Sequence, residues 1–126
     1  MDQTVKDVEE MDVFKLAHQL ALDVYKLTAA FPREEIYGLT SQMRRAATSV
    51  PANIMEGANR DSRAEYRRFV GISRGSAGEV RYHLLLAMDL QYLSKAEGQR
   101  LRQQYVRVIQ MLTNLAKSLQ SRARAS

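Results

Sequence analysis

Apolar residues recur at three- and four-residue steps along most of the chain, which is the spacing of one face of an α-helix. No stretch between turn signals shows the apolar–polar alternation of a half-buried β-strand. The first apolar face predicts a helix over about residues 11–31, which ends before Pro32 because the residue before a proline avoids helical backbone angles. The apolar positions of this face are Val13, Leu16, Ala17, Leu20, Val24, Leu27 and Phe31.

A second helix is expected over about residues 39–57, after a short polar connection that ends in glycine. Pro51 lies in the middle of this helix. Because proline has no backbone N–H and its ring clashes with the carbonyl four residues earlier, here that of Ala47, we expect a kink at this point.

Two Ser-x-x-Glu strings, at residues 62–65 and 94–97, have the spacing of capping boxes, in which the serine accepts a backbone hydrogen bond and the glutamate reaches back. They predict the starts of a long third helix over about residues 62–92 and of a fourth helix over about residues 94–120. Apolar residues of the fourth helix alternate four- and three-residue steps, which is the spacing of a packing seam between helices.

Residues 121–126 are small and basic, and we expect them to fray. Four amphipathic helices with short connections predict one all-α domain over residues 1–126. The expected fold is an antiparallel up-down four-helix bundle with a proline-kinked second helix and a long third helix. A length of 126 residues, with 45% hydrophobic and 26% charged residues, suits a single soluble domain.

Composition also excludes several classes of protein. The chain contains no cysteine, so disulfide frameworks, cysteine-ligated metals and thiol catalysis are excluded. The N-terminus has neither the basic nor the apolar region of an export signal, and no apolar run approaches the length of a membrane helix. We therefore expect a cytoplasmic protein without a membrane partner.

Charge is unevenly distributed along the chain. The formal net charge is +5, and 14 of the 19 basic residues are arginines. Residues 1–35 have a net charge of −4 and residues 36–126 a net charge of +9. Since guanidinium groups bind phosphate in a bidentate manner, this distribution suggests a polyanionic partner or complementary self-assembly.

Catalytic and metal-binding motifs are lacking in the sequence. A di-metal bundle needs inward glutamates and two Glu-x-x-His pairs, but the two histidines, His18 and His83, form no such pair, and both are expected on the surface or at an interface. There is no glycine-rich phosphate loop after a strand and no His-Glu-x-x-His string. We predict that the protein is not an enzyme and holds no metal or cofactor; a metal-dependent enzyme is the weakest alternative.

The third helix has an unusual surface. Arg60, Arg63, Arg67, Arg74 and Arg81 project within an arc of about 60° if the helix continues back to Arg60. Arg68 flanks this line, and beside it lies a row of three glycines, Gly71, Gly75 and Gly78. Each glycine weakens a helix by about 1 kcal/mol relative to alanine, so we expect a compensating close approach by another helix.

Two interpretations of this surface remain open, and they are compatible. One is a cationic groove for the backbone of a nucleic acid, and the other is a contact between subunits in which arginines meet acidic residues of a neighbour. The expected nucleic-acid contacts are Arg44, Arg60, Arg63, Arg67, Arg68, Arg74 and Arg81.

A cluster of polar residues flanks Pro51: Gln42, Arg45, Asn53 and Glu56. We expect Asn53 or Gln42 to bond the carbonyl that the kink leaves free, and Arg45 to pair with Glu56. The cluster is therefore interpreted as structural rather than catalytic.

Several strings of the sequence match a known signature. They include Phe31-Pro32, Tyr37-Gly38-Leu39-Thr40-Ser41-Gln42, Arg44-Arg45-Ala46-Ala47, Ser49-Val50-Pro51-Ala52-Asn53-Ile54, Glu56-Gly57, Arg68-Phe69, Gly75-Ser76, Glu79 and Leu84-Leu85-Leu86-Ala87. Over about residues 12–93 the chain resembles the four-helix-bundle proteins encoded in intervening sequences of bacterial 23S rRNA genes. This fold is similar to the accessory variability determinant of diversity-generating retroelements, which works with a reverse transcriptase. The resemblance implies an all-α protomer, a homopentameric ring with a basic surface, and nucleic-acid binding.

From these observations we predict a non-enzymatic homo-oligomer, most simply a pentamer, that binds the phosphate backbone of RNA or DNA with weak sequence specificity. The alternative is an assembly adaptor that binds a protein, such as a reverse transcriptase or an rRNA-processing enzyme, rather than nucleic acid itself.

Overall fold

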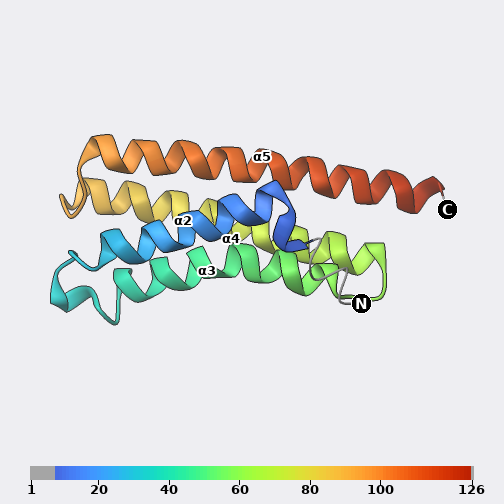
Figure 1. Ribbon diagram of the computed structural model, residues 1–126. Helices are drawn as coiled ribbons and strands as arrows, with labels where there is room; N and C mark the ends of the chain where they lie inside the picture. The colour runs from blue at the N-terminus through green and yellow to red at the C-terminus, as the bar shows by residue number, and fades with distance from the viewer. Residues whose placement is uncertain (1–7, 126) are drawn as a thin grey trace.

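The computed structural model describes residues 8–125, and this part of the chain is entirely helical apart from its turns and connections. The long helices are α2 (Asp12–Thr28), α3 (Leu39–Ala58), α4 (Arg63–Asp89) and α5 (Lys95–Ala125). A 3-10 turn, η1 (Arg33–Glu35), lies in the connection between α2 and α3. Figure 1 shows the helices lying alongside one another, with successive helices running in opposite directions. The expected all-α fold class is confirmed.

The core lies along the middle of this bundle. Helix α4 packs extensively against both α3 and α5, while α2 packs less extensively against α3 and α5. The largest side chains that are completely buried come from α3, α4 and α5: Met43, Ile54, Leu84, Leu101, Tyr105 and Leu112. Burial raises the pKa of the Tyr105 hydroxyl, which has no hydrogen-bond partner in the described part of the protein.

Local hydrogen bonds set where the helices begin and end. Ser62 caps α4, since its hydroxyl accepts a 3.1 Å hydrogen bond from the backbone N–H of Glu65, and Ser94 caps α5 through a 3.2 Å bond from Glu97. Helix α4 ends at Asp89, because Gln91, two residues further on, has a left-handed φ of 64° that cannot continue the helix.

Helix α2 ends at Thr28, three residues before the expected end at Phe31. The Thr28 side chain donates a 2.7 Å hydrogen bond to the carbonyl of Val24, and the chain then turns into Pro32. Helix α5, in contrast, is longer than expected. Its backbone is helical to Ala125, beyond the expected end near residue 120, because this alanine- and arginine-rich segment has high helix propensity. The expected fraying of residues 121–126 stays a prediction, and Ser126 lies outside the described residues.

Helix α3 continues through Pro51 without a break in its helical assignment. Beside the proline, the hydroxyl of the fully buried Ser73 donates a 2.7 Å hydrogen bond to the carbonyl of Val50. This bond joins α4 to α3 at the centre of the bundle.

None of the helices in residues 8–125 is both long and apolar enough to cross a membrane.

Candidate nucleic-acid interface

A groove of about 460 Å³ lies on the outside of the bundle between α4 and α5. Helix α4 contributes Ala64, Arg67, Arg68, Gly71 and Arg74, and helix α5 contributes Thr113, Ala116, Lys117 and Gln120. The groove is lined by four cationic residues and by no acidic residue. It is therefore suited to an anionic ligand.

Arg67 and Arg74 are seven residues apart in α4, so they share one face and are about 10 Å apart along the helix axis. Both are exposed. Within residues 8–120, neither Arg67 nor Lys117 has a side-chain hydrogen bond or ion pair, while Arg74 donates one 3.2 Å bond to the hydroxyl of Thr113. Most of the donors of these three cations are thus free to bind a ligand.

Arg60 and Arg68, which were also expected to contact nucleic acid, already have side-chain partners in the protein and lie near Phe69. Arg68 donates two 3.2 Å hydrogen bonds to Glu65, and these bonds lower the pKa of the Glu65 carboxyl. Arg60 pairs with Glu56 at 2.8 Å. The guanidinium groups of Arg60 and Arg68 lie 4.8 and 4.5 Å from the centre of the Phe69 ring, so both stack on it.

The expected continuous line of five arginines is wrong in part. Helix α4 begins at Arg63, so Arg60 lies in the preceding turn and lines a different groove, between α2 and α3. Arg63 is exposed in the first turn of α4. At the other end of the line, Arg81 is half-buried, and its Nε atom is buried without a partner among the described residues.

Arg44 lies at the contact between α3 and α2. Its Nε donates a 2.8 Å hydrogen bond to the Thr28 hydroxyl, another guanidinium nitrogen donates a 3.3 Å bond to the carbonyl of Tyr25, and the group stacks 4.7 Å from the centre of the Tyr25 ring. These contacts hold α3 against the last turn of α2. Arg44 therefore has a structural role, and it is not part of the α4–α5 groove.

The glycines of α4 face open space. A Cβ atom placed on Gly71, Gly75 or Gly78 would have no atom within 4 Å apart from the glycine's own helix and chain neighbours. The expected close approach of another helix to these glycines is thus not found within the protomer. Gly71 lines the floor of the basic groove between Arg67 and Arg74, where the absence of a side chain leaves the helix backbone accessible.

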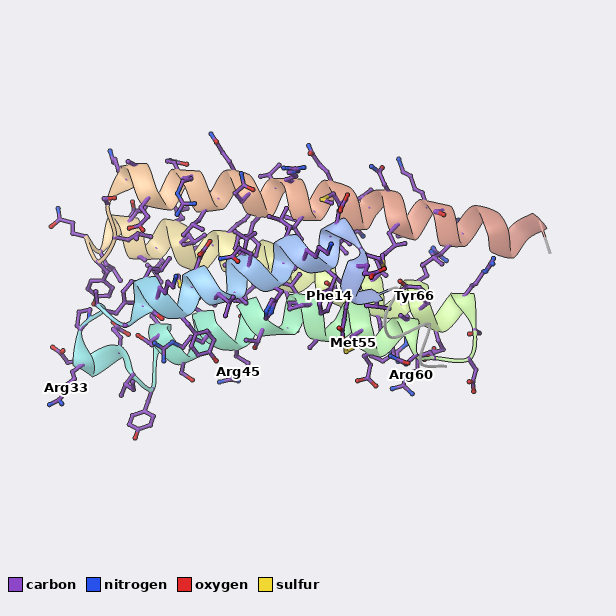
Figure 2. The ribbon with its side chains drawn as sticks, viewed as in Figure 1. Phe14, Arg33, Arg45, Met55, Arg60 and Tyr66 are labelled. Carbon is purple, nitrogen blue, oxygen red and sulfur yellow. The ribbon has the colours of Figure 1, made fainter. Side chains whose placement is uncertain are left out.

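The polar residues expected to form one cluster around Pro51 lie in two separate places along α3. Gln42 and Arg45 line a small cleft of about 220 Å³ between α3 and α4, whereas Glu56 pairs with Arg60 near the other end of α3. The expected pair between Arg45 and Glu56 is therefore wrong, because they lie about three turns apart in the helix. Figure 2 shows the corresponding separation of Arg45 from Arg60.

Asn53 connects this cleft to the backbone. Its side-chain nitrogen donates 2.8 Å hydrogen bonds to the carbonyl and to the hydroxyl of Ser49, and that hydroxyl is 2.9 Å from the hydroxyl of Ser76 on α4. The bond goes to the carbonyl of Ser49 rather than to that of Ala47. The pair of serines joins α3 to α4, which supports a structural role for Asn53.

The two histidines have different environments. His18 is exposed and stacks on Phe14 with 6.3 Å between ring centres. His83 is only 6% exposed, so the expectation that both histidines lie on the surface or at an interface is wrong for His83. Burial lowers the pKa of His83, although Glu79, 3.7 Å away, partly opposes the shift. In the described ranges, no three His, Asp or Glu residues gather closely enough to hold a metal ion.

The contribution of α5 to the groove was not foreseen from the sequence. Thr113, Lys117 and Gln120 are spaced by four and three residues, which places them on one polar helix face. The spacing shows that these three residues share one face of α5, but it does not show which helix lies beside that face. Only the packing register of α5 on α4 brings Thr113 opposite Arg74.

The family model described as "23S rRNA-intervening sequence protein" matches residues 9–114. Among solved structures, the fold is similar to a 1.70 Å crystal structure of a protein with unknown function from the S23 ribosomal protein family of Bacteroides thetaiotaomicron VPI-5482. The TM-score is 0.75 at 22% sequence identity, and the match covers 83% of this chain and 98% of that chain. No curated protein matches the sequence.

Proposed function

Because the chain belongs to the 23S rRNA-intervening sequence protein family, we propose that it is a non-enzymatic, homo-oligomeric protein that binds RNA or DNA. The observation that carries this proposal is the α4–α5 groove, in which Arg67, Arg74 and Lys117 present cationic groups with few or no partners in the described residues. Phosphate groups satisfy such donors and release counterions when they bind.

The groove is suited to the backbone rather than to the bases. None of its lining residues is aromatic, so it offers no surface on which bases stack. The protein therefore binds with weak sequence specificity, and the affinity falls steeply as salt rises.

The test is the salt dependence of binding to a fluorescently labelled RNA hairpin and to a DNA duplex of the same sequence, measured by anisotropy. Substituting both Arg67→Ala and Arg74→Ala removes two phosphate contacts, so the slope of log affinity against log salt falls by up to ~2. Arg107→Ala is the matched control, because Arg107 is exposed on α5 and does not line the groove. An unchanged slope in the double variant would contradict the proposal.

The proposed assembly is a cytoplasmic homopentamer, related to the accessory variability determinant of diversity-generating retroelements. A ring of protomers repeats the groove around one particle, so several weak sites act together on one nucleic acid. Light scattering of the protein with and without ribosomal RNA measures both the number of protomers in the particle and its binding to RNA.

We also propose that α3 bends at Pro51, since the carbonyl of Ala47 has no N–H partner there.

The second candidate is an adaptor for a reverse transcriptase or an rRNA-processing enzyme. Exposed apolar side chains on α4 favour it: Ile72 is 41% exposed and Tyr82 is 57% exposed, and both lie close in sequence to the open glycines. Co-purification with the enzyme encoded beside its gene, abolished by Tyr82→Ala but not by Arg67→Ala, would support this function over direct nucleic-acid binding.

A further inference from the structure

The connection between α2 and α3 presents two apolar side chains at its tip. Ile36 is 50% exposed and Tyr37 is 94% exposed. The carboxylate of Glu35 fixes the backbone beneath them, because one oxygen accepts a 3.1 Å hydrogen bond from the N–H of Leu39 and the other a 3.0 Å bond from the Tyr92 hydroxyl. A fixed loop that exposes an aromatic ring loses little conformational freedom when it binds a partner.

An open groove of about 620 Å³ lies between α2 and α3. Its lining is mainly apolar: Phe14, Ala21, Leu22, Tyr25, Pro51, Ala52 and Met55. Leu22 and Tyr25 are each 45% exposed. A hollow of this size and lining accommodates one or two large apolar side chains of a partner.

The charges around the groove complement those of the tip. Glu56 and Arg60 lie among the lining residues and pair at 2.8 Å, and their side chains are 53% and 45% exposed. The tip carries Arg33 and Glu34, both exposed and without an ion pair among the described residues. Because exposed ion pairs contribute little to stability, Glu56 and Arg60 can exchange their mutual contact for pairs with Arg33 and Glu34.

Ile36 shares a cleft with Tyr25 and Thr48 at the near edge of the groove, but the tip of one protomer does not reach the part of its own groove around Met55 and Arg60. Figure 2 shows Arg33 at one end of the bundle, and Met55 and Arg60 toward the opposite end. We propose that the tip of one copy docks Ile36 and Tyr37 into the α2–α3 groove of a second copy. This inference rests on the homo-oligomeric part of the proposed function and assigns its contact. Because the contact joins two different surfaces, each protomer of a ring has one docked tip and one filled groove.

Site-directed cross-linking tests the contact, since the chain has no cysteine of its own. A protomer with Tyr37→Cys is mixed with one carrying Ala52→Cys and treated with a short bismaleimide. The expected product is a covalent dimer in high yield. The matched control replaces the second protomer by Tyr82→Cys, an exposed position on α4 away from the groove, and gives little dimer. Equal yields from both mixtures would overturn the contact.

Sedimentation equilibrium gives an independent readout. Tyr37→Ala and Ala52→Arg each weaken self-association at least tenfold, while Tyr82→Ala leaves it unchanged; all three positions are exposed, and circular dichroism verifies that the variants fold. A mixture of Tyr37→Ala with Ala52→Arg forms a dimer of one of each, because one intact tip and one intact groove remain. Variants that associate like the wild type would overturn the inference.

Anisotropy with the labelled RNA hairpin and the DNA duplex on the same samples separates this inference from the proposed function. Specific cross-linking without binding to either nucleic acid would contradict nucleic-acid binding and leave the contact intact. RNA binding with non-specific cross-linking would contradict the contact alone.

Discussion

The hydroxyl of Ser73 donates a 2.7 Å hydrogen bond to the carbonyl oxygen of Val50, and both residues are completely buried. Val50 directly precedes Pro51, so this bond joins α4 to α3 beside the residue that cannot donate a backbone hydrogen bond. It is a polar contact from one helix to another among the apolar side chains of the core.

Removing this bond tests its contribution to stability. Ser73→Ala is expected to lower the free energy of unfolding by about 1 kcal/mol, the usual net contribution of one hydrogen bond. Urea unfolding followed by circular dichroism measures the change. Ser118→Ala, at an exposed position of α5, is the control and should have little effect. Equal stability of both variants and the wild type would show that the Ser73 bond makes no net contribution.

Replacing glycine by alanine should change the stability of the protein in opposite directions at two positions with different surroundings. Gly75→Ala is expected to stabilise the protein by about 0.5–1 kcal/mol, because the new methyl meets open space and alanine favours the helix. Gly57→Ala is expected to destabilise it, because the methyl would lie 2.8 Å from Cβ of Phe69. Thermal unfolding of the two variants compares them directly. A gain in stability for Gly57→Ala would contradict the packing of α3 on Phe69.

The buried His83 should make stability depend on pH. Burial lowers the pKa of His83 in the folded protein below its ordinary value of 6.5, so the unfolded chain takes up the proton first. Stability is therefore expected to fall as the pH drops through 6.5, by at most about 1.4 kcal/mol per pH unit, and this contribution levels off below the folded pKa. Urea unfolding between pH 5 and pH 8 measures the slope.

The control for this titration uses His18→Gln as the background, so that His83 is the single histidine. Adding His83→Gln should remove the histidine contribution to the slope near pH 6.5. A slope that persists unchanged in the double variant would assign the pH dependence to other groups.

Substituting Arg44 should change the stability of the protein, whereas substituting Arg67 should change its binding to RNA. Arg44→Ala is expected to lower the free energy of unfolding by about 1 kcal/mol, because it removes the bond to the buried Thr28 side chain, and to leave the salt slope of RNA binding unchanged. Arg67→Ala should reduce the salt slope by up to ~1 and change stability by less than about 0.5 kcal/mol. Urea unfolding and RNA anisotropy on each variant measure the two effects. A reduced salt slope in Arg44→Ala together with reduced stability in Arg67→Ala would contradict the roles assigned to these two arginines.

Helical periodicity, capping serines and Pro32 were sufficient to locate the helices along the chain, because all three act through local backbone geometry. The end of α2 at Thr28 was not predicted, since it depends on a turn whose hydrogen bonds run between Thr28, Phe31 and the residues around them. The helical state of α5 beyond residue 120 was also missed, because small basic residues are compatible with both a tail and a helix.

The candidate site was less predictable than the fold. Periodicity placed Arg67 and Arg74 on one face, but it did not show that Arg44 is held by Thr28, a contact between residues 16 positions apart. Nor did it assign Lys117 to the same groove, because that depends on how α5 is aligned against α4. Side-chain partners across helices follow from packing, which the sequence pattern of a single helix does not specify.

The open glycines of α4 also bear on how the chain folds during synthesis. Glycine lowers the intrinsic tendency of α4 to form a helix, so α4 depends on its neighbours α3 and α5 to become ordered. The ribosome releases α4 before α5, and until α5 emerges only one of these two neighbours is available. Cooperative folding of the bundle therefore has to wait for the last helix to be translated, and a nascent chain truncated before residue 95 should remain sensitive to protease.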